Sequence, residues 1–397
     1  MRNLLTVSVV ILAACDADGP DHTDTITTTV TSPPQACAEV DRSAAGQDLV
    51  FDPQTTLSGV YRVDGQQIYD SGEVVTVEPG TIFLMGGSAS VLFGWRSDPA
   101  TVMFQGTADA PILFCGTEDA AGHWKGLELL GGTTADSTVE HVRIEDAGWE
   151  DHAALLLWPS LPLRSVALVD NAGVGLDASL LHGSSDELTL TGNAWPATLR
   201  SGEAITNLPA GDYAGNVEDI IEVVSHENQD VVFHDRGVPY RQLDVRVVYG
   251  IAEGTPLSIT YEAGVVYEMC QDCDILFGWR SDPAMVQALG TANAPVVFTS
   301  ANPSPAPGDW NGIHLLSGTS SDSTFENVVF EFGGKASDDW EDSANLVVNA
   351  GLGTVVDCSF LDSAGYGLWL EDVEPGFTES GSVFAGNALG DVYDSGN

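Results

Sequence analysis

Short apolar runs separated by turn formers fill the chain from residue 37 onward, and this pattern predicts β-strands. Val74–Val77 is a β-branched run that ends at a Pro79-Gly80 turn. Similar runs, each closed by glycine or aspartate, are residues 81–85, 91–94, 100–104 and 111–114. Runs of this kind at close spacing indicate an all-β protein. Few stretches longer than about ten residues lack a turn former, so long helices are not expected.

The strand runs recur with a short period. In the first half, Val142, Val166 and Leu188 begin equivalent runs, 24 and then 22 residues apart. The corresponding runs of the second half are residues 328–332, 356–360 and 380–384. Such a period, apolar at alternate positions and ending in Asn or Gly, suits one coil of a parallel β-helix, whereas a propeller needs repeats of about 40–50 residues. We expect Asn and Gly at the corners to supply the positive φ that each bend needs.

A longer repeat duplicates this arrangement. Leu92–Ala100 returns without a change as Leu276–Ala284, 184 residues later. Further segments, residues 106–111, 122–127, 149–151 and 170–173, have counterparts at 290–295, 308–313, 340–342 and 362–365. The sequence therefore predicts a parallel β-helix built from two duplicated halves. The first half is residues 37–200 with an N-terminal cap, and residues 201–397 continue the same solenoid.

The first residues predict export and a lipid anchor. An apolar run begins after Arg2 and is too short to span a membrane. Leu12–Cys15 resembles the bacterial lipobox, which implies cleavage before Cys15 and acyl chains such as palmitate on that residue. Residues 1–14 are thus a predicted lipoprotein signal peptide, and residues 15–36 a lipidated cysteine with a disordered Thr-, Asp- and Pro-rich tether. This places the protein in the bacterial cell envelope, outside the cytoplasm. The outer membrane or cell surface is favoured.

The charge is strongly acidic. The chain has 58 Asp and Glu against 13 Lys and Arg. A surface of this sign repels phosphate backbones, so nucleic acid is excluded as a partner. Most of these carboxylates are expected on a solvated surface. The other interpretation of so many carboxylates is calcium binding, because hard cations take oxygen ligands. No EF-hand loop is present, and no metal site or cofactor is otherwise predicted.

Parts of the repeat resemble a known family. Gly106–Phe114 followed by Trp124–Leu127 looks like the repeat of right-handed parallel β-helix proteins exported by myxobacteria and related bacteria. Gly290–Phe298 followed by Trp310–Ile313 shows the same pattern. The resemblance covers about residues 45–397 and implies a right-handed solenoid outside the cytoplasm. It implies no reaction, because this fold carries lyases, hydrolases, adhesins and inert surface proteins.

The duplicated string holds the best candidate for a binding site. A tryptophan ring can stack on a sugar, while arginine and aspartate can hydrogen-bond hydroxyls or uronates. The candidate glycan-binding residues are Trp95, Arg96, Asp98, Trp279, Arg280 and Asp282. A structural role is nevertheless expected for the two arginines: each should hold its turn by pairing with a carboxylate of its own turn or of the next coil. Trp149–Asp151 and Trp340–Asp342 are expected on a neighbouring loop.

The cysteines predict two disulfides. Cys270 and Cys273 have redox spacing, but no βαβ pattern surrounds them and no set of four zinc ligands is present, so a local disulfide is expected in an exported chain. Cys37 and Cys115 would tie the N-terminal cap to an early coil. Cys358 remains as a buried thiol.

The sequence favours a surface-anchored, non-enzymatic module with a structural or adhesive role. It lacks a Gly-x-Ser-x-Gly elbow and a metalloprotease helix motif. A glycosidase needs two carboxylates at a fixed separation, and no pair stands out among so many acids. Arg143 with Glu145 and Asp146 is the one compact set that would suit a lyase. The expected partners are the membrane, through the N-terminal lipid, and an extracellular polysaccharide or envelope protein. The alternative function is a polysaccharide-binding or polysaccharide-degrading β-helix, and no catalytic residue is predicted.

Overall fold

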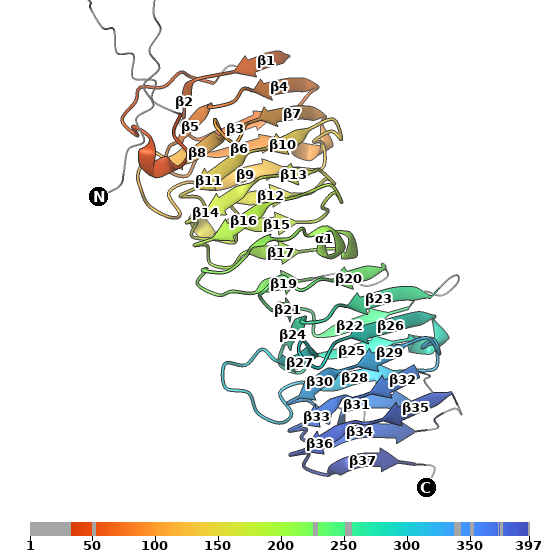
Figure 1. The fold of residues 1–397 in the computed structure, drawn as a ribbon. Helices are drawn as coiled ribbons and strands as arrows, with labels where there is room; N and C mark the ends of the chain where they lie inside the picture. Colours follow the sequence, from red (N-terminus) through yellow and green to blue (C-terminus); the bar gives the residue numbers. More distant parts are fainter. Residues whose placement is uncertain are drawn as a thin grey trace, which may run out of the picture.

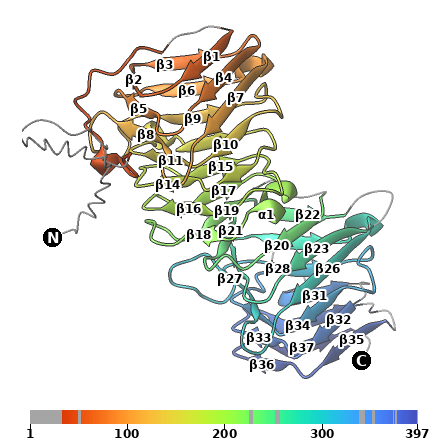
Figure 2. The same ribbon diagram turned by 45° about the horizontal axis from the view of Figure 1, so that its top comes forward.

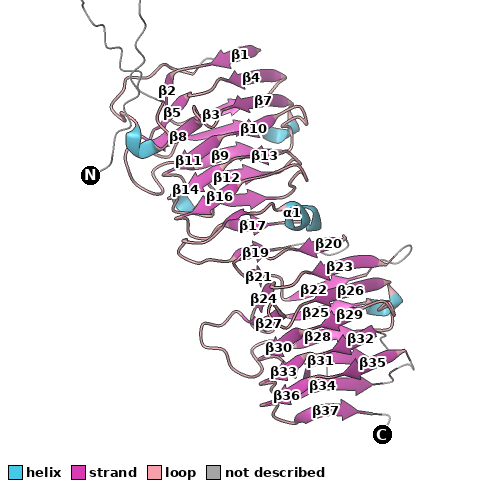
Figure 3. Ribbon diagram, in the orientation of Figure 1, coloured by secondary structure: helices cyan, strands magenta, loops and turns pink. Residues whose placement is uncertain are grey.

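The chain folds into a parallel β-helix, as predicted. The computed structural model describes residues 33–49, 53–224, 229–250, 256–336, 343–349, 353–371, 373 and 376–395. Within this part, 37 strands account for nearly all regular structure, with one short helix, α1 (Gly202–Asn207), and four single 3₁₀ turns (Figures 1 and 3). The expected lipidation site Cys15 and the segment Trp340–Asp342 lie outside the described residues.

In the first half, each full coil contributes one strand to each of three sheets. The 5-stranded sheet contains β1 (Gln54–Leu57), β4 (Glu73–Val77), β7 (Ala100–Gln105), β10 (Thr138–Glu140) and β13 (Leu163–Arg164). The 7-stranded sheet contains β2 (Val60–Val63), β5 (Ile82–Met85), β8 (Ile112–Gly116), β11 (Val142–Glu145), β14 (Ala167–Val169), β16 (Leu188–Thr191) and β18 (Gly211–Asp212). The third is the start of the 13-stranded sheet, with β3 (Gln66–Tyr69), β6 (Ser90–Phe93), β9 (Gly126–Leu129), β12 (Leu155–Leu157), β15 (Leu176–Ala178), β17 (Ala197–Leu199) and β19 (Ile221–Val223).

The second half repeats this winding. The 13-stranded sheet continues with β21 (Tyr240–Gln242), β24 (Val266–Met269), β27 (Val296–Ser300), β30 (Val328–Glu331), β33 (Ser359–Leu361) and β36 (Val383–Ala385). A 6-stranded sheet, the β20 sheet, contains β20 (Val231–Phe233), β23 (Leu257–Tyr261), β26 (Ala284–Leu289), β29 (Thr324–Glu326), β32 (Gly353–Val356) and β35 (Phe377–Ser380). Another, the β22 sheet, contains β22 (Arg246–Tyr249), β25 (Asp274–Phe277), β28 (Gly312–Leu315), β31 (Ala344–Asn349), β34 (Tyr366–Glu371) and β37 (Gly390–Asp394).

The 13-stranded sheet runs through both halves, but strands that are equivalent in the duplication do not both belong to it. β6 and β25 both end in the Leu-Phe pair that begins the duplicated string, yet β6 belongs to the 13-stranded sheet and β25 to the β22 sheet. The sheet that forms the third strand of each coil in the first half forms the second strand of each coil in the second half. The second stack is therefore displaced sideways from the first, as both views of the ribbon show (Figures 1 and 2).

Alternating burial explains why these runs form strands. In β7, Ala100, Val102 and Phe104 point into the core and the residues between them do not. The short sequence period corresponds to neighbouring strands of one sheet: β11, β14 and β16 lie side by side in one half, and β30, β33 and β36 in the other. Side chains at equivalent positions therefore stack from coil to coil and build a continuous core.

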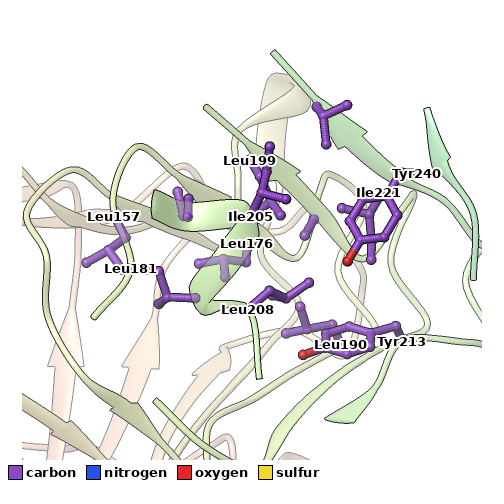
Figure 4. Packing of buried hydrophobic residues seen from close by; sticks show 14 of the residues in the cluster. Leu157, Leu176, Leu181, Leu190, Leu199, Ile205, Leu208, Tyr213, Ile221 and Tyr240 are labelled. Carbon is purple, nitrogen blue, oxygen red and sulfur yellow. The ribbon is translucent and has the colours of Figure 1, made fainter. Parts of the chain in front are cut away.

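Aromatic rings and aliphatic side chains fill the interior. Phe298, Phe330, Phe360 and Phe384 stack in one column with centroid separations of 5.6, 5.0 and 5.0 Å. Where the first half ends, the core is mostly aliphatic with Tyr213 and Tyr240 beside it, and Ile205 of α1 packs into it (Figure 4). The helix begins at Ser201, whose hydroxyl accepts a hydrogen bond from the Ala204 N–H.

The corner asparagines play a different part from the expected one. The positive φ angles lie one residue earlier, at Asp170 and Gly192. Asn171 and Asn193 are instead buried and form a hydrogen-bonded ladder between coils. The side chain of Asn193 accepts from Asn171 and donates to the Leu168 carbonyl oxygen. The expectation of a positive φ holds for the glycine, Gly192, but is wrong for Asn171 and Asn193, because their amides are used to satisfy buried backbone groups.

Both expected disulfides are present, Cys37–Cys115 and Cys270–Cys273, and Cys358 is a buried free thiol. The first bond fixes the N-terminal strap, residues 33–49, to the outside of the 7-stranded sheet. Apolar residues of the strap cover Ile82, Leu84 and Leu113, which face outward from that sheet. The strap thus buries an apolar strip that the coils alone would expose.

Candidate functional site

The duplicated string forms a tight 3₁₀ turn, η2 (Trp95–Ser97), between β6 and β7. Gly94 precedes the turn with φ 71°. A Cβ atom on Gly94 would lie 2.1 Å from the Thr133 nitrogen, so the next coil passes directly against this position. The Thr133 hydroxyl donates to the Phe93 carbonyl oxygen at 3.0 Å and holds the two coils together.

The second copy, η4 (Trp279–Ser281), is built in the same way. Gly278 has φ 72°, and a Cβ atom there would lie 2.2 Å from the Thr319 nitrogen. The Thr319 hydroxyl donates to the Phe277 carbonyl oxygen at 3.0 Å. The shared glycine is therefore explained by the close approach of the next coil.

The expected pairing of each arginine with a carboxylate is wrong. Among the described residues, neither Arg96 nor Arg280 has a carboxylate within ion-pair distance. The two guanidinium groups instead lie over the rings of Trp95 and Trp279, at 5.8 and 5.6 Å from the centroids. Both arginines are exposed, and such a contact contributes only about 0.5–1 kcal/mol at exposed sites. The close packing around the glycine is therefore the tightest contact that holds the turn against the next coil.

The structure adds a residue that the sequence did not single out. Trp158 directly follows β12 and is 49% exposed, against 38% for Trp95. A Cβ atom on Gly131 would lie 3.7 Å from the Trp158 ring and 3.9 Å from the Ser97 hydroxyl. Trp158 and the η2 turn therefore flank the same glycine on one edge of the solenoid. Trp158 has no partner in the duplication, so no sequence signal connected it with Trp95.

Trp149 lies on a different edge. It starts the turn η3 (Trp149–Asp151), which joins β11 to β12, so it borders the opposite side of the 13-stranded sheet from η2. Lys125 lies over its ring at 5.4 Å from the centroid. The expectation that this turn adjoins the Trp95 turn is therefore wrong. Its counterpart Trp340–Asp342 is outside the described residues.

The outer face of the sheet between these two edges carries different side chains in the two halves. Glu128 lies between Leu92 and Leu156 in the first half, and burial raises the pKa of its carboxyl. The equivalent residue of the second half is His314, which is buried, and burial lowers the pKa of its imidazole to about 3. The two copies therefore have different ionisable groups at this position, a carboxyl in the first half and an imidazole in the second.

The set of Arg143, Glu145 and Asp146 has a structural role. Glu145 is bonded to Arg143 and accepts from the Cys37 N–H, while Asp146 accepts from Arg42 of the strap at 2.6 Å. These groups hold the strap against the coils and are largely buried. The described residues contain no group of three or more His, Cys, Asp or Glu side chains placed to hold a metal ion. Nor does that part of the chain contain a helix long and apolar enough to cross a membrane.

The comparisons agree with the fold. A family model described as a pectate-lyase-like β-helix domain matches residues 239–346, which run from just before β21 into β31. The matched segment includes the turn η4 but not η2. No curated protein and no solved structure matches the chain.

Proposed function

We propose that this protein is a lipid-anchored, non-enzymatic β-helix of the bacterial cell surface that acts as an adhesive module and binds extracellular polysaccharide. The observation that carries the proposal is the edge formed by Trp95, Arg96 and Trp158. Two large aromatic rings are exposed there, on coils separated by one intervening coil, beside an arginine that forms no ion pair with any described residue. We call this the tryptophan edge.

The chemistry of the tryptophan edge suits a sugar. Aromatic rings present a flat apolar face on which the apolar face of a sugar ring can stack. Arg96 and Asp98 are exposed and supply a donor and an acceptor for hydroxyl or carboxyl groups. The acidic composition of the chain weakens its general attraction to anionic molecules. Binding of a glycan would therefore depend on the side chains of the tryptophan edge.

Replacing the two tryptophans tests the binding site. We expect Trp95→Ala and Trp158→Ala each to weaken binding of a polysaccharide selected on a glycan array by about 3- to 10-fold, because each removes one stacking surface. The measurement is a titration of the lipid-free domain with the selected glycan. Trp149→Ala, on the other edge, is the control and should bind as the wild type does. Equal affinity of all four proteins would contradict the proposal.

The anchor is tested separately. We expect Cys15→Ala to release the protein from the membrane fraction or to block its maturation, because the acyl chains that would hold it are attached to that thiol and amine. Fractionation and metabolic labelling with a palmitate analogue measure this. Unchanged, lipid-labelled membrane association of the variant would disprove the anchor without touching the glycan site.

A further inference from the structure

The tryptophan edge spans three successive coils in a fixed register. Phe93, Leu129 and Leu157 pair directly across β6, β9 and β12. Trp95 and Gly131 each come two residues after these paired positions, and Trp158 comes one residue after. Neighbouring strands lie about 4.8 Å apart, so Trp95 and Trp158 are on coils about 10 Å apart along the solenoid axis, with Gly131 on the coil between them.

Gly131 leaves this space open. A Cβ atom there would be in ordinary contact with Trp158 and Ser97, at 3.7 and 3.9 Å, so a side chain longer than alanine would extend into the space between Trp158 and the η2 turn. The residue is exposed, and its backbone is not in the left-handed region. The fold therefore does not require glycine here, in contrast to Gly94. What the missing side chain provides is open space between Trp158 and the turn that carries Trp95.

We propose that the tryptophan edge binds an extended linear glycan that runs along the solenoid axis, with one sugar ring on Trp95, one on Trp158 and the chain passing over Gly131. The inference rests on the proposed function and adds the ligand class: an internal stretch of a linear polysaccharide, recognised over at least three units. One sugar unit of an extended chain is about as long as the strand spacing, so rings two coils apart match alternate positions along the chain. A monosaccharide reaches only one ring.

The second half offers a matched control. Phe277, Leu315 and Val348 pair in the same register across β25, β28 and β31. At the positions of Gly131 and Trp158, this half has Ser317 and Asn349. The second copy therefore has the duplicated turn without the open glycine or the second ring, and it does not form the same path.

A size series of oligosaccharides tests the inference. For the lipid-free domain we expect affinity to rise about 10-fold or more from the monosaccharide to the tri- or tetrasaccharide and then to level off, because the second ring contributes only when the chain reaches it. Gly131→Leu should abolish that gain, while Gly131→Ala should keep most of it. Trp279→Ala should bind every member of the series as the wild type does. Thermal unfolding checks that the variants fold.

The outcomes separate the two proposals. A wild type that binds the monosaccharide as tightly as the hexasaccharide, or a Gly131→Leu variant that keeps the length dependence, overturns the axial path and leaves glycan binding intact. A wild type that binds no member of the series overturns both. Loss of the length dependence in Trp279→Ala would place the path in the second half and overturn the assignment to the tryptophan edge.

Discussion

Gly94→Ala is expected to destabilise the protein by about 3–5 kcal/mol. The residue has φ 71°, a conformation that costs a non-glycine residue about 1–2 kcal/mol. The new Cβ would also lie 2.1 Å from the Thr133 nitrogen and 2.3 Å from the Gly132 carbonyl carbon. These are backbone atoms of the next coil, so they cannot move aside without breaking the contact between coils, which adds a few kcal/mol. Urea denaturation followed by circular dichroism measures the loss.

The chain provides two comparisons for this variant. Gly131→Ala lies on the same edge, where the added Cβ meets only ordinary contacts, and should change stability by less than about 0.5 kcal/mol. Gly278→Ala repeats the steric conflict in the second half, with a Cβ 2.2 Å from the Thr319 nitrogen, and should cost about as much as Gly94→Ala. The two losses should add in the double variant because the sites are far apart. A Gly94→Ala variant as stable as Gly131→Ala would refute the close-packing account of the duplicated turn.

Asn193→Ala is expected to cost about 3–4 kcal/mol. The Asn193 side chain is fully buried and bonds to groups on both neighbouring coils. Its oxygen accepts from the Asn171 side chain at 2.9 Å, and its amide donates to the Leu168 carbonyl oxygen at 2.9 Å and to Asn216 at 3.2 Å. Alanine removes these bonds and leaves the Asn171 amide and the Leu168 carbonyl buried without them, at about 1–3 kcal/mol for each such group.

Asn216→Ala is the comparison for the ladder. Asn216 is half-buried at the next coil, and its amide also lies near the exposed Asp219. Water can therefore replace part of what the side chain supplies, and the expected cost is about half that of Asn193→Ala. Both are measured by chemical denaturation under the same conditions. Equal losses for the two variants, or a loss below about 1 kcal/mol for Asn193→Ala, would show that the ladder contributes little to coil stacking.

At the candidate site, the repeated residues predicted an important turn but did not reveal which contacts form it. The duplicated string correctly indicated a structurally important turn, but the reason assigned to its arginine was wrong. Gly94 and the passing backbone of the next coil do the work expected of Arg96. The residue that completes the tryptophan edge, Trp158, lies outside the repeat and meets η2 only because two further coils bring it alongside. A contact of this kind depends on the length of every intervening turn.

The sequence by itself determined that the chain winds into coils of short parallel strands. Alternating apolar positions, the short period and the duplicated segments predicted the parallel β-helix, and the cysteine positions predicted both disulfides, because strand patterns and turn chemistry are local or periodic. Only the tertiary structure decided how the coils are joined and what they expose. The sideways displacement of the second half, the strap over Leu84 and Leu113, and the alignment of Trp95, Gly131 and Trp158 all depend on which strand stacks on which. That choice is made by packing between residues distant in the chain, and such packing leaves no periodic trace in the sequence.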